Sequence, residues 1–354
     1  MIFIDYMKDA GDMTDIKSMY IDELTEWVKR AGQPSFRAKQ LYAWMHEKYV
    51  GSVDEMTNLP KTMRTQVLEA GFVTVQEEMR QVSDRDGTIK FLFRMQDGQM
   101  IESVLMRHNY GNSICISSQA GCRMGCRFCA STIGGLVRNL TASEMLEQVY
   151  AAMRMTGERI SNIVVMGTGE PLDNYDNLIR FIRIISDEAG YHISQRNITV
   201  SSCGIVPRIY DLAKENLTIT FALSLHAPTD EERKELMPIA HRYTLQETID
   251  ACKAYFETTG RRITFEYSLV KGKNDTVEHA EKLAELLHGI NCHVNLIPVN
   301  PINEREFERS NNDSVQKFKL ALEKKSINST IRKSMGSDID AACGQLRRKY
   351  AEKK

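Results

Sequence analysis

Hydrophobic and polar positions follow three successive patterns along the chain. Within residues 19–71, apolar residues recur at helical spacing, which predicts a small N-terminal domain of short helices. Within residues 72–112 the apolar positions alternate with polar ones between turn residues, which predicts a β-rich connector of three strands. Residues 1–18 show neither pattern and are interpreted as a variable leader.

From residue 113 to 334, apolar strand-like runs alternate with amphipathic helical segments. The six predicted strands are SICISSQ, SNIVVMG, RNITVSS, TITFALSL, RITFEYSL and HVNLIPV, and NSTIRKS could add a short closing strand. Six strand–helix units predict a parallel sheet with helices outside it. They are too few for an eightfold barrel, so the predicted fold is α/β, a partial (β/α)6 barrel. In such folds the chemistry lies beyond the carboxyl ends of the strands. Residues 335–354 form a separate C-terminal segment.

Composition narrows the class of protein. The 354 residues are 42% hydrophobic and 26% charged, an ordinary globular balance. No run approaches the ~20 apolar residues of a membrane span, and no basic region precedes an apolar run at the N-terminus. We therefore expect a cytoplasmic protein without membrane contact, whose eight cysteines are ligands, nucleophiles or core residues. A formal net charge of −1 argues against a mainly electrostatic nucleic-acid coat protein.

The strongest chemical signal is the motif C-x-x-x-C-x-x-C, formed by Cys122, Cys126 and Cys129 after the first strand of the barrel. Three thiolates at this spacing can bind three irons of a 4Fe–4S cluster and leave the fourth iron open to a small molecule. A zinc site completed by another ligand, or three unrelated thiols, are the alternatives. Zinc sites usually show paired C-x₂₋₄-C units completed by another Cys or His, so the motif favours the cluster.

Polar residues also follow the other predicted strands. Singly, each is more typical of a turn, a helix cap or a structural histidine. Together they predict one ligand cavity, in which Cys129, Glu170, Ser201, His226 and Asn300 should meet.

The three-cysteine motif, GTGEP, SSCG, SLHAP, HVNLIPVNP and GSDIDAACGQLR resemble, in this order, the RlmN family of radical S-adenosylmethionine RNA methyltransferases. The resemblance implies a partial radical-SAM barrel with an N-terminal helical RNA-binding domain. It implies methylation of C2 of an adenine in 23S rRNA (peptidyl-transferase region) and of the adenine next to the anticodon in tRNA. The implied cofactors are a 4Fe–4S cluster and two S-adenosylmethionine molecules per turnover. The implied partners are both RNAs and an electron donor such as flavodoxin, and a monomer is expected.

The resemblance also implies roles for individual residues. Cys122, Cys126 and Cys129 would hold the cluster. The residues that would contact S-adenosylmethionine are Gly169, Glu170, Ser201, Ser224, Leu225, His226 and Asn300. Cys343 would carry a methyl group during catalysis and Cys115 would resolve it through a disulfide, with Glu102 as the proton acceptor. Two positions depart from the family pattern: Thr168 replaces a frequent methionine, and Cys203 a frequent serine.

Two alternative functions stay open at this point. One is a Cfr-like methyltransferase that modifies C8 of the same rRNA adenine, and the other is a non-catalytic iron–sulfur or zinc RNA-binding protein. The Cys115–Cys343 pair argues against the binding protein, which needs no resolving thiol. RNA contact is the least specific inference, because each candidate residue is more often a solvated surface charge. The candidates are Arg37, Lys39, Arg64, Arg123, Arg127, Arg138, Arg347, Arg348 and Lys349. Phe36, Tyr42 and Trp44 of the helical domain are interpreted mostly as core.

Overall fold

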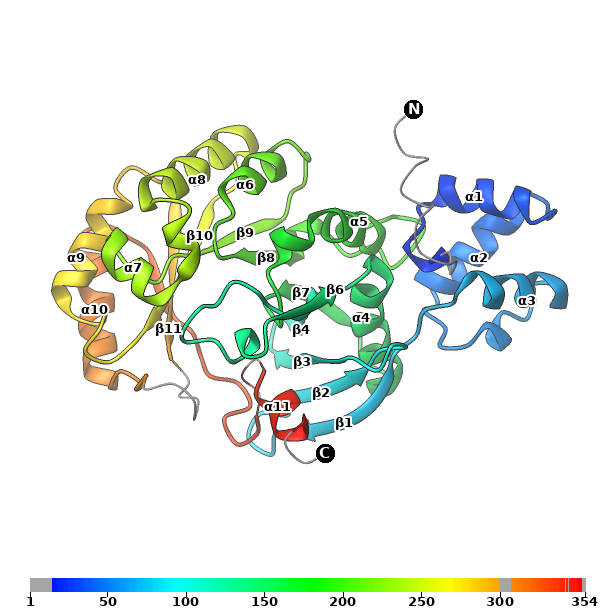
Figure 1. Cartoon of the computed structure of the whole chain (residues 1–354), viewed down its shortest axis with the longest axis horizontal. Helices are drawn as coiled ribbons and strands as arrows, with labels where there is room; N and C mark the ends of the chain where they lie inside the picture. The colour runs from blue at the N-terminus through cyan, green and yellow to red at the C-terminus, as the bar shows by residue number, and fades with distance from the viewer. Residues whose placement is uncertain (1–14, 300–306, 341, 343, 352–354) are drawn as a thin grey trace.

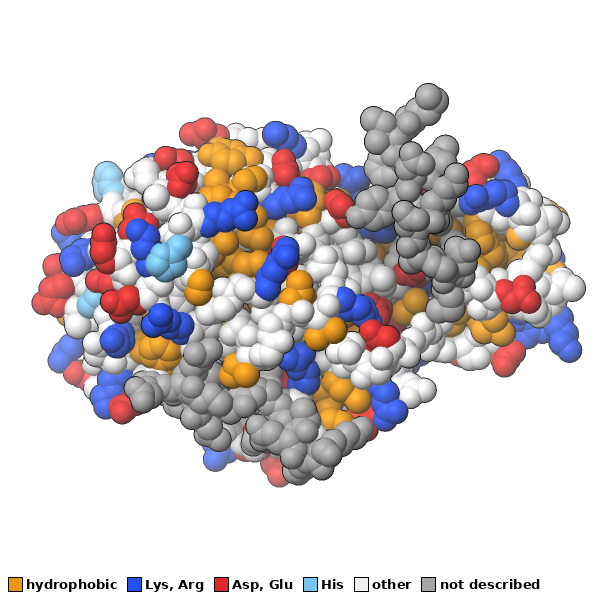
Figure 2. Space-filling model, in the orientation of Figure 1, with side chains coloured by type: hydrophobic (Ala, Val, Ile, Leu, Met, Phe, Trp, Pro, Cys, Tyr) orange, Lys and Arg blue, Asp and Glu red, His pale blue; other side chains and the backbone are white. Residues whose placement is uncertain are grey.

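The computed structural model describes residues 15–299, 307–340, 342 and 344–351. Asn300 and Cys343 therefore lie outside the described residues. None of the helices in the described part of the chain is long and apolar enough to span a membrane. Figure 2 shows Lys and Arg side chains interspersed with Asp and Glu over the face in view, in keeping with the formal net charge of −1.

Three helices form the N-terminal unit, as the helical spacing predicts: α1 (Ile21–Arg30), α2 (Phe36–His46) and α3 (Lys61–Ala70). They share a core of their own, which includes Leu24, Leu41, Met45, Met63 and Val67. Of the three aromatic residues interpreted mostly as core, Tyr42 is buried and Trp44 half-buried, whereas Phe36 is 55% exposed. The unit lies to one side of the barrel (Figure 1).

The unit is fixed to α4 (Ala142–Thr156) of the barrel by buried polar contacts. Lys17 Nζ lies 2.7 Å from Glu147 Oε1, and both side chains are fully buried. His46 Nδ1 lies 3.1 Å from the hydroxyl of Tyr150. A buried ion pair is stable only when it is well hydrogen-bonded, and Lys17 also donates to the carbonyl of Val73.

Within the described residues, ten strands form one sheet, in the order β1-β2-β3-β4-β7-β8-β9-β10-β11-β12. Its first part is the antiparallel extension β1 (Gln76–Val82), β2 (Ile89–Arg94) and β3 (Met100–His108), and β3 pairs antiparallel with β4 (Gly111–Ile116). The parallel strands that follow β4 are β7 (Ile160–Val165), β8 (Ile198–Ser202), β9 (Thr220–Ser224), β10 (Ile263–Leu269), β11 (Cys292–Pro298) and the short β12 (Ser329–Ile331). This arrangement confirms the predicted open α/β barrel and its β extension.

The sheet has one apolar and one polar face. In β10, Ile263, Phe265 and Tyr267 are buried in the main core, whereas Thr264 and Glu266 point to the opposite face because side chains alternate along a strand. Figure 1 shows the outer helices over the sheet. They are α4, α5 (Tyr175–Ile185), α6 (Val206–Ala213), α8 (Leu245–Thr259), α9 (Val277–Leu286) and α10 (Asn312–Lys324). The face of the sheet turned away from these helices carries polar side chains such as Thr264 and Glu266.

Two short strands and two helices were not expected from the sequence. A second sheet pairs β5 (Gln119–Gly121) with β6 (Leu136–Asn139), α7 (Asp230–Leu236) follows β9, and α11 (Gln345–Ala351) ends the described chain. The first strand of the β-rich connector, β1, begins at Gln76, whereas the connector is predicted to begin at residue 72. Strands of three and four residues are too short to show a periodicity, so only their pairing reveals them.

Candidate active site

The three cysteines of the motif lie on one loop between β5 and a short 3₁₀ helix, Ala130–Thr132. Cys122 donates its main-chain N–H to the carbonyl of Gly135, 2.9 Å away, at the base of the loop. The N–H of Arg127 donates to the carbonyl of Leu236 in α7, also at 2.9 Å. The loop is thus held between the small hairpin and α7.

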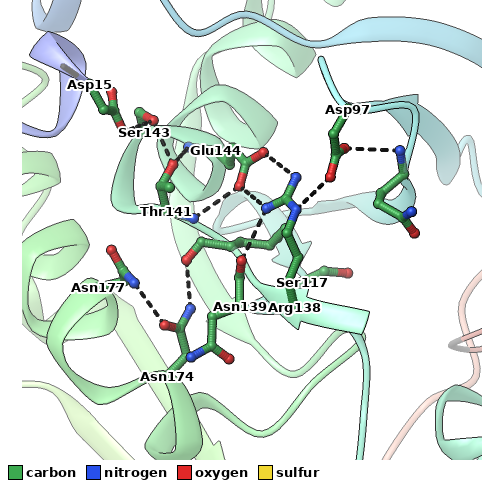
Figure 3. A network of polar contacts seen from close by, with 12 residues as sticks. Asp15, Asp97, Ser117, Arg138, Asn139, Thr141, Ser143, Glu144, Asn174 and Asn177 are labelled. Carbon is green, nitrogen blue, oxygen red and sulfur yellow. Dashed lines mark hydrogen bonds and ion pairs between the residues drawn. The ribbon is translucent and has the colours of Figure 1, made fainter. Parts of the chain in front are cut away.

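Arg138 of β6 anchors the hairpin that carries this loop (Figure 3). Its guanidinium makes two 2.7 Å hydrogen bonds to the carboxylate of Glu144 and a 2.6 Å bond to Asp97. Glu144 also accepts from the N–H of Thr141 in the capping box that begins α4. Arg138, a predicted RNA contact, therefore joins the hairpin, α4 and the β2–β3 turn. Arg123, another predicted RNA contact, forms an ion pair with Asp173.

The thiols of the cysteine loop are buried, and their ionised forms would repel one another. Burial raises the pKa of Cys122 to about 12 and that of Cys126 well above its ordinary value, and negative charge on the neighbouring thiols adds to both shifts. Thiols that bind metal are deprotonated, so a bound cation has to offset this cost. Within the described residues, no three His, Cys, Asp or Glu side chains converge on a single metal ion. A cubane cluster places its cysteines on different irons, so Cys122, Cys126 and Cys129 would each bind one iron of such a cluster.

Arg233 of α7 is a residue that the sequence analysis missed. Its side chain is fully buried, Nη2 donates to the carbonyl of Cys203 at 2.7 Å, and Nη1 has no hydrogen-bond partner within the described part of the chain. Its positive charge opposes the rise in the pKa of Cys126. A buried guanidinium needs a negative partner, and an anionic cluster–thiolate group would supply one. One arginine in a charged helical segment gives no sequence signal of this role.

The GTGEP turn after β7 packs tightly against the start of β5. A Cβ atom on Gly169 would lie 2.7 Å from the main-chain nitrogen of Gln119, and the φ of Gly169 is +113°, so only glycine fits there. Glu170 is buried, and its carboxylate accepts from the N–H groups of Leu172 (3.0 Å) and Cys203 (2.8 Å). Burial raises the pKa of Glu170, although these hydrogen bonds oppose the shift.

The strand ends of β8 and β9 lie beside this turn. The hydroxyls of Ser201 and Ser224 are 3.4 Å apart, and the N–H of Leu225 donates to the carbonyl of Glu266. His226 Nδ1 accepts from the N–H of Ser268 at 2.9 Å, so the neutral ring carries its proton on Nε2. Burial lowers the pKa of His226 to about 3, which keeps the ring neutral.

Three contacts bring the predicted ligand-binding elements together at the carboxyl ends of the strands. The ring of Phe128, in the cysteine loop, meets that of His226 edge-on at 4.7 Å between centroids. Ser131 Oγ lies 3.3 Å from Thr168 Oγ1, and Glu170 joins the ends of β7 and β8 through Cys203. Thr168 and Cys203, the two departures from the family pattern, are both buried in these contacts.

Two of the three residues predicted to be catalytic, Glu102 and Cys115, lie on β3 and β4. Cys115 is buried on β4, and its register partner on β3 is Val104, two residues from Glu102. Glu102 Oε2 accepts from the N–H of Gly344 at 2.5 Å and lies 2.9 Å from Lys90 Nζ. The main chain at Gly344 therefore docks on β3, the neighbour of the strand that carries Cys115.

Comparison with known proteins identifies the family. Residues 116–287 match the radical SAM superfamily, and residues 14–73 match the ribosomal RNA large subunit methyltransferase N-terminal domain. A protein of Lachnoclostridium phytofermentans called a probable dual-specificity RNA methyltransferase RlmN is 57% identical over 98% of both chains. The chain belongs to the RlmN family.

Other relatives agree with this assignment to the RlmN family. A protein of the same name from Lachnospira eligens is 59% identical over 96% of this chain and 97% of its own. The crystal structure of a radical SAM methyltransferase from Sphaerobacter thermophilus superposes with a TM-score of 0.90 and 43% identity, covering 94% of this chain and 98% of the other. The protein is thus a radical SAM RNA methyltransferase, a class that uses a 4Fe–4S cluster and S-adenosylmethionine.

Proposed function

We propose that this enzyme methylates C2 of an adenine in 23S rRNA and of the adenine next to the anticodon in tRNA, with the methyl group carried on Cys343. The observation that carries the proposal is the position of Gly344, the residue after Cys343. Its N–H is bonded to Glu102, and a Cβ atom there would lie 3.0 Å from the nitrogen of Ser131, two residues beyond Cys129. The C-terminal segment thus meets both the cysteine loop and the β extension.

Cys122, Cys126 and Cys129 would hold the cluster. The proposed contacts to S-adenosylmethionine are Gly169, Glu170, Ser201, Ser224, Leu225, His226 and Asn300. The cluster and S-adenosylmethionine together supply the radical chemistry that an aromatic C2–H, which is not nucleophilic, requires. Two molecules of S-adenosylmethionine are used per turnover, because one provides the methyl group and another is consumed in the radical step.

Each proposed contact has a chemical basis in the geometry. The carboxylate of Glu170 would pair with the ammonium group of S-adenosylmethionine. The hydroxyls of Ser201 and Ser224 can donate and accept, and His226 presents an Nε2–H donor. Gly169 lets a ligand approach the main chain where a side chain would block it.

The chain's own residues account for the other steps. The thiolate of Cys343 would take the methyl group of one S-adenosylmethionine by displacement, and S-adenosylhomocysteine would leave. After the methyl carbon has joined the adenine ring, Glu102 accepts the proton from C2. The sulfur of Cys115 then attacks the sulfur of Cys343, and a disulfide forms as the methylated base leaves. A reductant is needed to restore both thiols.

The proposed setting follows from this chemistry and from the family. The electron donor is a flavodoxin-type protein, and the enzyme acts as a monomer in the cytoplasm. The N-terminal helical domain is proposed to contact RNA. In support, the exposed Phe36 lies beside Arg37, and Lys48 lies 3.8 Å over the ring of Trp44. Aromatic and cationic groups of this kind are able to stack on unpaired bases.

An anaerobic assay tests the proposal. Reconstituted enzyme is mixed with a 23S rRNA fragment or tRNA, S-adenosylmethionine and a reductant, and the nucleosides are analysed by mass spectrometry. We expect 2-methyladenosine from the intact enzyme and from Cys252→Ala, whose thiol lies in the core under α8, and none from Cys343→Ala. If 8-methyladenosine appears, the enzyme methylates C8 and the proposed position C2 is wrong. If cluster-loaded protein forms no methylated adenosine, the proposal is refuted.

A further inference from the structure

Lys90 of β2 is a fully buried lysine that none of the steps above uses. Its Nζ donates to the carbonyl of Ala342 at 2.7 Å and lies 2.9 Å from Glu102 Oε2. Ala342 and Gly344 are the two neighbours of Cys343. The side chains of Lys90 and Glu102, from adjacent antiparallel strands, therefore hold the main chain on both sides of that cysteine.

The two side chains have complementary roles in this arrangement. The ammonium group of Lys90 holds the carbonyl before Cys343. The carboxylate of Glu102 holds the N–H after it, through Oε2, and the N–H of Arg347 through Oε1 at 2.7 Å. Glu102 is 3% exposed, so these are charge-assisted hydrogen bonds in a site that excludes most water, where they are strong and directional.

A separate set of contacts docks the residues before this point. The carboxylate of Asp338 accepts from the Ser83 hydroxyl at 2.6 Å and from the N–H of Asp84 at 2.9 Å. Gln81 exchanges hydrogen bonds with Asp340 at 3.1 and 3.0 Å. Residues 338–340 are therefore attached to the β1–β2 hairpin without Lys90. Loss of Lys90 should loosen the Cys343 turn and leave the rest of the segment docked.

We propose that Lys90 is a positioning residue for methyl transfer, and that the Lys90–Glu102 pair fixes the main-chain turn which presents Cys343 to the target adenine. This inference rests on the proposed function. In this proposal, Lys90 acts through the main chain beside Cys343 and does not contact substrate or cofactor. A methyl-bearing sulfur displaced by about 1 Å is enough to lower the rate about a hundredfold, because the reacting atoms must be held within a short approach distance.

The test separates radical formation from methyl transfer. Lys90→Met, Lys90→Arg and Asp338→Ala are reconstituted, and 5′-deoxyadenosine and 2-methyladenosine are quantified in the same reaction. For Lys90→Met we expect at least about ten times more 5′-deoxyadenosine per 2-methyladenosine than for the wild type. This ratio corresponds to a roughly tenfold slower methyl transfer relative to radical formation. Lys90→Arg, which keeps the charge, should recover part of the coupling, and Asp338→Ala should keep the wild-type ratio.

Hydrogen exchange provides a readout that is independent of activity. In Lys90→Met, amides of residues 342–351 should exchange faster than in the wild type, while those of the barrel strands stay protected. Lys90→Gln replaces Lys90→Met if the latter does not fold. An unchanged product ratio with unchanged exchange, or both products lowered in equal proportion, would overturn the proposal. If the wild type forms no 2-methyladenosine, the proposed function fails, while the exchange experiment still tests the Lys90–Glu102 pair.

Discussion

The main-chain N–H of Cys203 donates a 2.8 Å hydrogen bond to Glu170 Oε2, which joins the ends of β7 and β8. The other carboxylate oxygen accepts from Leu172 at 3.0 Å. Two amide donors therefore hold a buried negative charge at the end of the barrel where the cysteine loop lies. Burial alone raises the pKa of this carboxyl, so a cationic ligand would stabilise its ionised form.

Replacement of Glu170 by glutamine should weaken binding of S-adenosylmethionine. The amide has no charge for the ammonium group, and its NH₂ would face an N–H of Cys203 or Leu172. Because a charge-assisted hydrogen bond contributes about 1.5–3 kcal/mol, the dissociation constant should rise at least about tenfold. Equilibrium binding to reconstituted protein measures this. The control is Glu188→Gln, an exposed carboxylate after α5. Equal affinities in both variants would contradict the role of Glu170.

Cys126→Ala should abolish the brown cluster, whereas Cys252→Ala should keep it. Both cysteines are buried, so truncation of either removes a similar side chain, but only Cys126 lies in the cysteine loop. Iron and sulfide content and the absorbance near ~400 nm are measured after anaerobic reconstitution. A colourless wild type that retains zinc would instead support the zinc alternative.

Gly344→Ala should block methyl transfer without loss of the cluster. The φ of Gly344 is +78°, and a Cβ atom would lie 3.0 Å from Ser131 N, so the turn has to shift away from the cysteine loop. We expect formation of 2-methyladenosine to fall at least about tenfold with iron content unchanged. Gly157→Ala is the matched control, since its φ of +70° has no atom near the added Cβ. It should cost about 1 kcal/mol of stability and keep activity. Equal activity in both variants would contradict the close packing of Gly344 against Ser131.

His46 should make the N-terminal unit less stable in acid. Burial lowers its pKa to about 3 from an ordinary value near 6.5, so between these values the unfolded chain binds a proton that the folded chain does not. Stability therefore falls as the pH drops through 6.5. From pH 8 to pH 5.5 the loss due to this group is about 1.4 kcal/mol.

Urea unfolding followed by tryptophan fluorescence measures this loss. Both tryptophans of the chain, Trp27 and Trp44, lie in α1 and α2, so the signal reports on the N-terminal unit. His46→Gln lacks the titrating ring, so between pH 8 and pH 5.5 its free energy of unfolding should fall by about 1.4 kcal/mol less than that of the wild type. Parallel pH dependence of the two proteins would exclude His46 as the cause.

The succession of strands and helices along the chain and the N-terminal helical unit could be predicted because their signals are local. Each barrel strand carries a run of β-branched or aromatic residues, as in Ile263–Leu269, and each outer helix repeats its apolar face over several turns. The hairpin β5–β6 could not be predicted, because Gln119–Gly121 has no periodicity and its pairing depends on β6. Exposure of Phe36 likewise depends on packing that a helical pattern does not specify.

By itself, the sequence determined the three-cysteine motif, the order of strands and helices along the chain, and the family. These rest on residues within a few positions of one another, where spacing and alternation have direct physical meaning. Only the tertiary structure decided that Glu102 meets Gly344, 242 positions away, that Lys90 donates to the carbonyl of Ala342, and that Arg233 donates to the carbonyl of Cys203. Hydrogen bonds from buried side chains to the main chain of distant segments leave no pattern in the local sequence, because any residue offers the same N–H and carbonyl groups.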